Sequence, residues 1–271
     1  MGNLLPIGAM RETPLTQAIE ASLARIAAEP PGPARLEAQL RQLAKWRSVV
    51  LANTLAARQG DAIAHGPFAG MAYPVAASEG GRAPRLMGTY EASLHPVLEM
   101  VIARAYPQVL DIGCAEGYYA VGLARRMPDR LIHARDSDAR ARALCAALAK
   151  ANGVTDRLRI GPEVTQADLA LCARARTFVL CDIEGAEETL LDPARAPALI
   201  EADLLVETHS PAALDRLAAR FGASHRITRI DRALRPDLLP DWDETLSDLD
   251  RLLLLWEWRA RPTPWLWMER T

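Results

Sequence analysis

The order of apolar and polar positions divides the chain into a helical N-terminal part and an alternating α/β part. Residues 15–28 and 34–58 carry apolar side chains at helical spacing, and a Pro-Pro-Gly-Pro run separates them. In the second predicted helix, the apolar side chains form one stripe, which needs to be covered by its own domain or by another subunit. The pattern favours its own domain. The stripe comprises Leu36, Leu40, Leu43, Trp46, Val50 and Leu51.

From residue 90 onward, segments of helical period alternate with short apolar runs typical of strands. The predicted helices are 90–105, 117–126, 138–151, about 166–174, one from 187, and 211–220. The predicted strands are 108–112, 130–135, 157–161, 177–182, 203–207 and 226–230, with a closing pair around 252–258 and 265–268. Residues 248–258 fit both periods. This order predicts an α/β fold with a doubly wound, mostly parallel seven-stranded sheet, in which ligands bind at the carboxyl ends of the strands.

Between these parts, residues 60–88 are rich in Gly, Pro and Ala, with Phe68, Met71 and Tyr73 spaced through them. We interpret the segment as an ordered loop, either a lid whose residues 66–71 touch cofactor or acceptor, or a linker. The predicted organisation is therefore a helical extension (1–60), a lid or linker (61–88) and a catalytic domain (89–271).

The amino-acid composition limits the binding partners and the cellular locations that can be expected. Half of the residues are hydrophobic and the formal charge is −2, so a polyanion such as nucleic acid is not an expected substrate. No apolar run reaches 18 residues, and no membrane span is expected. The cysteines show no C-x-x-C spacing and lie among apolar residues, which predicts buried reduced thiols and a cytoplasmic location. They are Cys114, Cys145, Cys172 and Cys181.

The chemistry centres on a glycine turn that follows the strand 108–112. Gly113 permits a tight exit from the strand, and Gly117 removes a side chain where the helix start approaches a strand or a ligand. Asp111 is a candidate acceptor for a cationic group. Asp136 comes 19 residues after Gly117, which suits an acid that binds ribose hydroxyls. The spacing lacks the G-x-G-x-x-G of a pyrophosphate turn, so it indicates a nucleoside cofactor without a pyrophosphate; the alternative is a generic α/β turn with a surface Asp.

With this turn and acid, the chain resembles the class I S-adenosylmethionine-dependent methyltransferases. Three further stretches narrow the resemblance to the FkbM-like family: Leu-Met-Gly-Thr-Tyr-Glu at 86–91, Cys-Asp-Ile-Glu-Gly-Ala-Glu at 181–187 and Leu-Leu-Val-Glu-Thr-His at 204–209. The resemblance covers about residues 66–210, and residues 1–60 match nothing. It implies S-adenosyl-L-methionine as cofactor, an antiparallel last strand, and methyl transfer to a small molecule, usually to oxygen, with a sugar or secondary metabolite as acceptor.

The resemblance also suggests further cofactor residues. Tyr90 and Glu91 would help to enclose the methionine end, with a helix start capped by Thr89 as the alternative. Tyr118 lies in the turn itself, and Glu163 occupies the place where related folds contact adenine.

Acids and bases at strand ends are the candidates for activating an acceptor hydroxyl. His209 is the preferred general base, because a neutral imidazole accepts a proton near pH 7. The alternatives are that His209 caps a helix or binds Asp182, that Glu184 or Glu207 is the base, or that Asp182, Glu207 and His209 hold a divalent metal. Asp182 is also a candidate for contact with the cofactor or the acceptor.

Two other functions stay open. N-methylation of a small molecule is one, although the Asn/Asp-Pro-Pro-aromatic signature is absent after the fourth strand, which argues against base methylation. A cofactor-binding scaffold or partner subunit of a biosynthetic complex is the other, with residues 1–60 holding the partner. The same helices would pair two chains into a homodimer if their own domain leaves the stripe uncovered.

Overall fold

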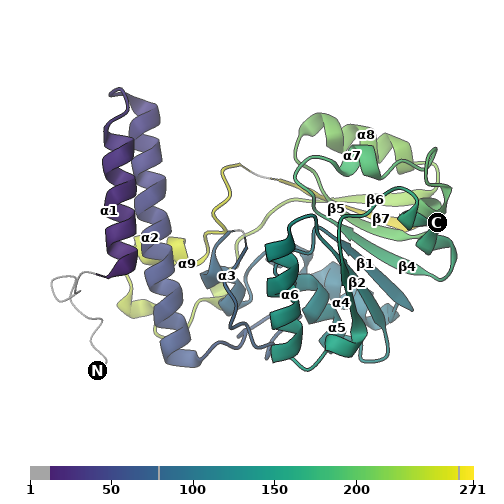
Figure 1. Ribbon diagram of the computed structural model, residues 1–271, viewed down its shortest axis with the longest axis horizontal. Helices are drawn as coiled ribbons and strands as arrows, with labels where there is room; N and C mark the ends of the chain where they lie inside the picture. Colours follow the sequence, from purple (N-terminus) through teal and green to yellow (C-terminus); the bar gives the residue numbers. More distant parts are fainter. Residues whose placement is uncertain (1–12, 79, 262) are drawn as a thin grey trace.

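A seven-stranded sheet with helices on both faces forms the larger part of the molecule, and the N-terminal helices lie at the opposite end (Figure 1). This computed structural model describes residues 13–78, 80–261 and 263–271. The strand order is β3-β2-β1-β4-β5-β7-β6, and only β7 runs antiparallel to its neighbours. The strands are β1 Gln108–Ile112, β2 Leu131–Arg135, β3 Leu158–Gly161, β4 Thr177–Cys181, β5 Asp203–Glu207, β6 His225–Ile230 and β7 Trp265–Arg270. The predicted fold class and the antiparallel last strand are confirmed.

Two helical layers bury the two faces of the sheet. The first contains α4 (His95–Arg104), α5 (Tyr118–Arg126) and α6 (Ala139–Ala151). The second contains α7 (Glu187–Leu190), α8 (Pro211–Phe221) and short 3-10 turns (Figure 1). Because β1 and β4 lie between both layers, they are buried along their whole length, and most of their side chains are apolar. All four cysteines are buried, and no helix among the described residues is long and apolar enough to cross a membrane.

Three predicted elements differ in the structure. The helix predicted from residue 90 begins at His95, because Glu91 adopts a left-handed φ of 47° and a 3-10 turn follows it, so Thr89 is not a helix cap. Residues 168–173 form a 3-10 helix. The predicted strand 252–258 is wrong: Ser247 caps a helix, α9 (Asp248–Leu254), by accepting a hydrogen bond from the backbone N–H of Asp250.

Residues 60–88 form a strap that packs into the core. The strap contains the short helix α3 (Arg82–Met87). Phe68, Met71 and Tyr73 are fully buried, and the Phe68 ring meets the Tyr118 ring edge-on at 5.3 Å. The prediction that residues 66–71 touch a ligand is therefore not supported, because burial of their apolar side chains holds them beneath α5.

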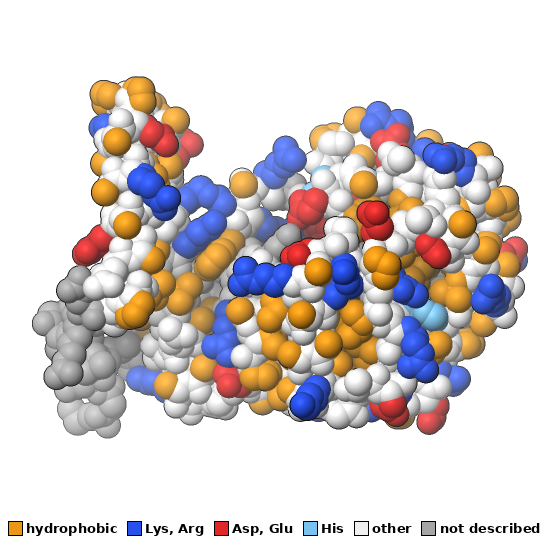
Figure 2. Space-filling model, in the orientation of Figure 1, with side chains coloured by type: hydrophobic (Ala, Val, Ile, Leu, Met, Phe, Trp, Pro, Cys, Tyr) orange, Lys and Arg blue, Asp and Glu red, His pale blue; other side chains and the backbone are white. Residues whose placement is uncertain are grey.

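The N-terminal helices α1 (Pro14–Ala27) and α2 (Pro33–Gln59) form a pair that projects from the rest of the molecule (Figure 1). The second half of α2 packs on the domain, with Leu51 and Leu55 buried. The first half does not, and apolar side chains are visible on the projecting pair in Figure 2. Leu36, Leu40 and Leu43 are 63%, 68% and 45% exposed. The predicted stripe is thus covered by its own domain over only half its length.

Candidate functional site

A cavity of about 700 Å³ lies at the carboxyl ends of the central strands. Gly113, Asp136, Glu163 and Asp182 follow β1, β2, β3 and β4 respectively, and all four line it. They meet there because the carboxyl ends of parallel strands lie at one edge of the sheet. Of the other predicted residues, Tyr90, Tyr118 and Glu184 also line the cavity, whereas Glu91, Asp111, Gly117, Glu207 and His209 do not.

Both glycines of the turn are required because other parts of the chain pack closely against them. Gly113 has a φ of +84°, and a Cβ atom there would lie 1.7 Å from the carbonyl oxygen of Asp182. Gly117 has a φ of +93°, and its Cβ would lie 2.7 Å from Sγ of Cys145 in α6. The predicted tight turn at Gly113 is confirmed. At Gly117, however, the group that leaves no room for a side chain is Cys145 of α6, and not a strand or a ligand.

Asp136 presents a fixed carboxylate to the cavity. Its Oδ2 accepts a hydrogen bond from the Ala115 backbone N–H at 2.9 Å, and its Oδ1 accepts one from the Asp138 N–H at 2.8 Å. Each carboxylate oxygen has a second lone pair, so two hydroxyl donors can still bind. This geometry suits the ribose-binding role predicted for Asp136.

Asp111 lies away from the cavity. It is 1% exposed, and its carboxyl group interacts with the backbone of Ala120 in α5. Burial, assisted by the charge of Asp136, raises its pKa to about 7. The prediction that Asp111 accepts a cationic ligand group is therefore not supported, because a residue inside a buried strand faces helices, whereas Asp136 stands just beyond a strand end.

A buried ion pair closes one end of the cavity, and sequence reasoning missed it. Arg85 is 3% exposed; its Nε lies 2.9 Å from Oε1 of Glu116, and its guanidinium lies 3.9 Å from the centroid of the Tyr90 ring. The Tyr73 hydroxyl donates to Glu116 at 2.6 Å. Burial opposes ionisation of Glu116, but Arg85 and this hydroxyl lower its pKa overall. Glu116 sits inside the glycine turn and could have been found there, whereas Arg85 is one of many arginines.

Glu91 lies behind the cavity wall. Its carboxylate accepts hydrogen bonds from the Tyr119 hydroxyl and the Arg259 guanidinium. Burial raises its pKa to about 7, against the opposing effect of Arg259. Because Tyr119 lines the cavity and Glu91 does not, Glu91 positions an aromatic wall residue instead of contacting a ligand directly.

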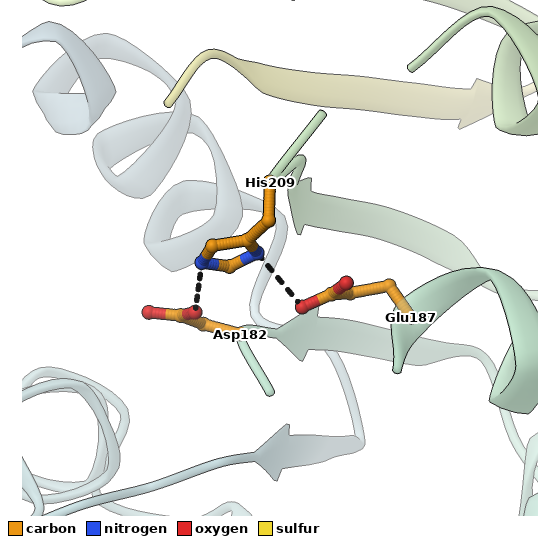
Figure 3. A group of neighbouring side chains, drawn as sticks. All are labelled: Asp182, Glu187 and His209. Carbon is orange, nitrogen blue, oxygen red and sulfur yellow. Dashed lines mark ion pairs between the residues drawn. The ribbon is translucent and has the colours of Figure 1, made fainter. Parts of the chain in front are cut away.

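Four carboxylates surround His209, as Figure 3 shows for two of them. The imidazole Nδ1 lies 3.1 Å from Oε1 of Glu187. Its Nε2 lies 3.3 Å from both Glu207 and Glu184, and 3.6 Å from Asp182. Both ring nitrogens therefore face acceptors, which is the arrangement of a doubly protonated imidazolium.

This environment does not favour His209 as a general base. Hydrogen bonds donated by the ring to Glu187 and Glu207 outweigh burial and raise the His209 pKa to about 10. A ring that holds both protons at neutral pH has no lone pair with which to accept another. Asp182 lines the cavity, and burial together with the charge of Glu207 raises its pKa well above the usual range. Of the four carboxylates around His209, Asp182 and Glu184 line the cavity.

Glu187 and Glu207 are themselves held in place by hydrogen bonds from neighbouring groups. Glu187 Oε1 accepts from the backbone N–H groups of Ile183 and Gly185, at 3.0 and 3.1 Å, and so fixes the turn after β4. Glu207 Oε1 accepts from Arg259 and from the Thr263 hydroxyl. Sequence reasoning missed Arg259, which the loop between α9 and β7 brings to the end of β5.

The same cluster offers ligands for a cation. Asp182, Glu187 and His209 each supply one ligand atom, and these atoms lie within 4.8 Å of one another. The predicted metal set contained Glu207 in place of Glu187, but one Glu207 oxygen is already held by Arg259. Glu184 stands at the rim, with a left-handed φ of 56° and a 66% exposed side chain.

Comparisons with known proteins agree with the fold and go no further. No protein family description and no curated protein sequence matches the chain. It is similar to the structure of a putative O-methyltransferase from Klebsiella pneumoniae, with 10% identity over 97% of this chain and 93% of that chain, at a TM-score of 0.44. An O-methyltransferase from Bacillus cereus in complex with SAH gives 10% identity over 93% and 100%, at 0.45. A human methyltransferase 10 domain-containing protein gives 11% over 84% and 96%, at 0.47. Likeness at this level carries no argument about activity, and the strand order itself establishes a seven-stranded, mostly parallel α/β fold.

Proposed function

We propose that this chain is an S-adenosylmethionine-dependent methyltransferase that methylates an oxygen of a small molecule, as its FkbM-like motifs suggest. The observation that carries the proposal is the cavity at the ends of β1 to β4, where a glycine turn and the fixed carboxylate of Asp136 stand side by side. A cavity of about 700 Å³ is in the range for a small-molecule site.

The lining residues suit the three parts of this cofactor. Asp136 would accept the ribose hydroxyls, and Glu163 with Val164 would flank the adenine. Arg85 would attract the methionine carboxylate, between the rings of Tyr90 and Tyr118. S-adenosylmethionine supplies an electrophilic methyl group, so the protein has to position an acceptor and remove its proton.

We assign to Asp182 the removal of the proton from the acceptor hydroxyl. A hydroxyl acceptor needs a base within hydrogen-bond reach, and Asp182 is the strand-end acid that lines the cavity beside His209, whose positive charge opposes the rise of the Asp182 pKa. Burial opposes ionisation of Glu207, but hydrogen bonding with His209 and Asp182, together with the charge of Arg259, lowers the Glu207 pKa to about 2. His209 is then a positioning residue.

A turnover assay tests the proposal. Purified protein is incubated with radiolabelled S-adenosylmethionine and panels of sugars, phenols, hydroxy acids and amines, and the products are identified by mass spectrometry. We expect transfer to a hydroxyl, with Asp182→Asn lowering turnover by roughly two to four orders of magnitude. A scaffold would bind the cofactor without consuming it, and an N-methylated product would refute the oxygen assignment.

We also propose that the chain forms a homodimer through its N-terminal helices. Leu36, Leu40 and Leu43 repeat at the four- and three-residue spacing of a helix–helix seam and are exposed along one stripe. Pairing two such stripes about a two-fold axis would bury them. The formal charge of −2 gives no basis for nucleic-acid binding, and the buried thiols suit a cytoplasmic enzyme of a biosynthetic pathway.

A further inference from the structure

A second cavity of about 500 Å³ lies where α2 meets the strap, apart from the site described above. In Figure 1, the segment that leads from α9 to β7 runs between α2 and the sheet, and its Trp258 forms one wall. The described lining residues come from α2, from the strap and from this segment. They are Lys45, Ser48, Val49, Ala52, Asn53, Ala76, Ala77, Ser78, Gly80, Arg82 and Trp258.

The lining residues that the structure describes carry two positive charges. Lys45 and Arg82 are the two cations, and no Asp or Glu occurs among these described lining residues. Arg82 is balanced by Asp61 at 2.7 Å, outside the lining. Lys45 makes no ion pair within the described part of the chain, and its ammonium lies 5.1 Å from the centroid of the Trp258 ring. An anionic group in this cavity would supply the opposite charge that Lys45 lacks.

Trp258 is held in place as a flat wall. Its backbone has a left-handed φ of 65°, which is uncommon for a bulky residue. Arg41 donates a hydrogen bond to its carbonyl oxygen at 3.1 Å, and its indole Nε1–H donates to the Ser48 hydroxyl at 3.2 Å. Such strained conformations cluster at ligand-binding sites, where surrounding contacts enforce them. A fixed indole favours a planar ligand group that can stack on it.

The two cavities share a wall. The backbone N–H of Ser78 donates to Oε2 of Glu116 at 2.9 Å, and a Cβ atom on Gly80 would lie 3.3 Å from Nη1 of Arg85. Glu116 and Arg85 line the first cavity, while Ser78 and Gly80 line the second. A ligand in the second cavity would therefore press on the segment that holds the buried Arg85–Glu116 pair.

We propose that the second cavity binds a small molecule that carries a carboxylate or phosphate on a flat ring. Lys45, with Arg82 beside it, receives the anion, and the ring stacks on Trp258. The donors Ser48, Asn53 and Ser78 fix its orientation. The inference rests on this cavity alone and does not depend on methyl transfer.

Calorimetric titration of the full-length chain with benzoate and phenyl phosphate tests the proposal, with benzyl alcohol as the uncharged analogue. We expect saturable binding of the two anions and none of the alcohol at the same concentrations. Lys45→Gln should weaken anion binding roughly tenfold, because one charge-assisted contact is lost. Lys150→Gln is the matched control: Lys150 is the only other lysine, is exposed on α6 and does not line the cavity.

Trp258→Leu gives a second readout, since it should weaken the aromatic anions more than inorganic phosphate. Absence of saturable binding to the wild type, or equal binding by Lys45→Gln and Lys150→Gln, would overturn the proposal. Titration of the same variants with S-adenosylhomocysteine reports on the first cavity, so failure of one site is distinguished from failure of the other.

Discussion

Replacement of His209 by Gln tests whether this residue is an ion-pair partner or a base. The ring stands among Asp182, Glu184, Glu187 and Glu207, with its side chain only 12% exposed. A glutamine retains part of the hydrogen bonding but none of the charge. If His209 is a permanent cation, the variant should lose stability in a defined pH range.

The magnitude follows from the pKa. It is raised from 6.5 to about 10, and a tenfold change in proton affinity is worth about 1.4 kcal/mol, so the ion pairs contribute at most about 5 kcal/mol below pH 6.5 and about 4 kcal/mol at pH 7. Glu184 is 66% exposed and water screens part of its charge. We therefore expect His209→Gln to lower the free energy of unfolding by about 2 to 3 kcal/mol at pH 7.

The sign of the pH dependence is fixed by the raised pKa. The contribution is complete below the unfolded pKa near 6.5 and is lost as the pH rises through about 10. Urea unfolding of both proteins between pH 6 and 10.5 should show the stability difference shrinking toward zero at the alkaline end. His65→Gln, at an exposed histidine, is the control and should be near neutral throughout.

Turnover measurements on His209→Gln can contradict the ion-pair role of His209. If His209 were the base, His209→Gln would keep its stability at pH 7, lose activity, and regain activity at alkaline pH as solvent takes the proton. An NMR titration of the wild type that places the His209 pKa near 7 would likewise refute the imidazolium assignment.

Three further predictions concern the turn, the metal alternative and assembly. Gly113→Ala should destabilise the fold by about 3 kcal/mol or more in urea unfolding, because its Cβ would overlap the Asp182 carbonyl, whereas Gly153→Ala, with a positive φ but open space, should cost about 1 to 2 kcal/mol; equal costs would contradict this packing argument. A chelator should leave methyl transfer unchanged if Asp182 acts as base, and loss of activity that zinc or magnesium restores would instead assign a metal to the cluster. Light scattering should show a dimer that Leu40→Glu converts to a monomer, and a monomeric wild type would exclude the proposed interface.

The sheet could be predicted closely because strand and helix periods are local properties of the sequence. The five parallel central strands begin and end within one residue of their predicted bounds, and the glycine turn occurs where it was expected. The residues after those strands were placed at one edge of the sheet by topology alone. Asp136 and Asp182, proposed from their positions at strand ends, and Glu163, proposed from the family resemblance, all line the cavity.

Side-chain direction and long-range contacts were not predictable in the same way. Asp111 and Asp136 both accompany strands, but only the second stands beyond its strand end and reaches the cavity. Arg259 contacts Glu91 and Glu207, residues far from it in sequence, through a loop with no regular period. The interpretation of His209 changed because three carboxylates from residues 182–187 and a fourth from β5 converge on it, and such convergence is visible only in three dimensions.

Binding of S-adenosylhomocysteine measured by calorimetry tests the central claim most directly. We propose that the ribose binds Asp136, whose carboxylate is already held by two backbone N–H groups. Wild type should bind with one site per chain, and Asp136→Ala should weaken binding by at least roughly tenfold, whereas Asp156→Ala, at an exposed acid near β3, should bind as wild type does. Failure of the wild type to bind S-adenosylhomocysteine, or equal binding by both variants, would contradict the account.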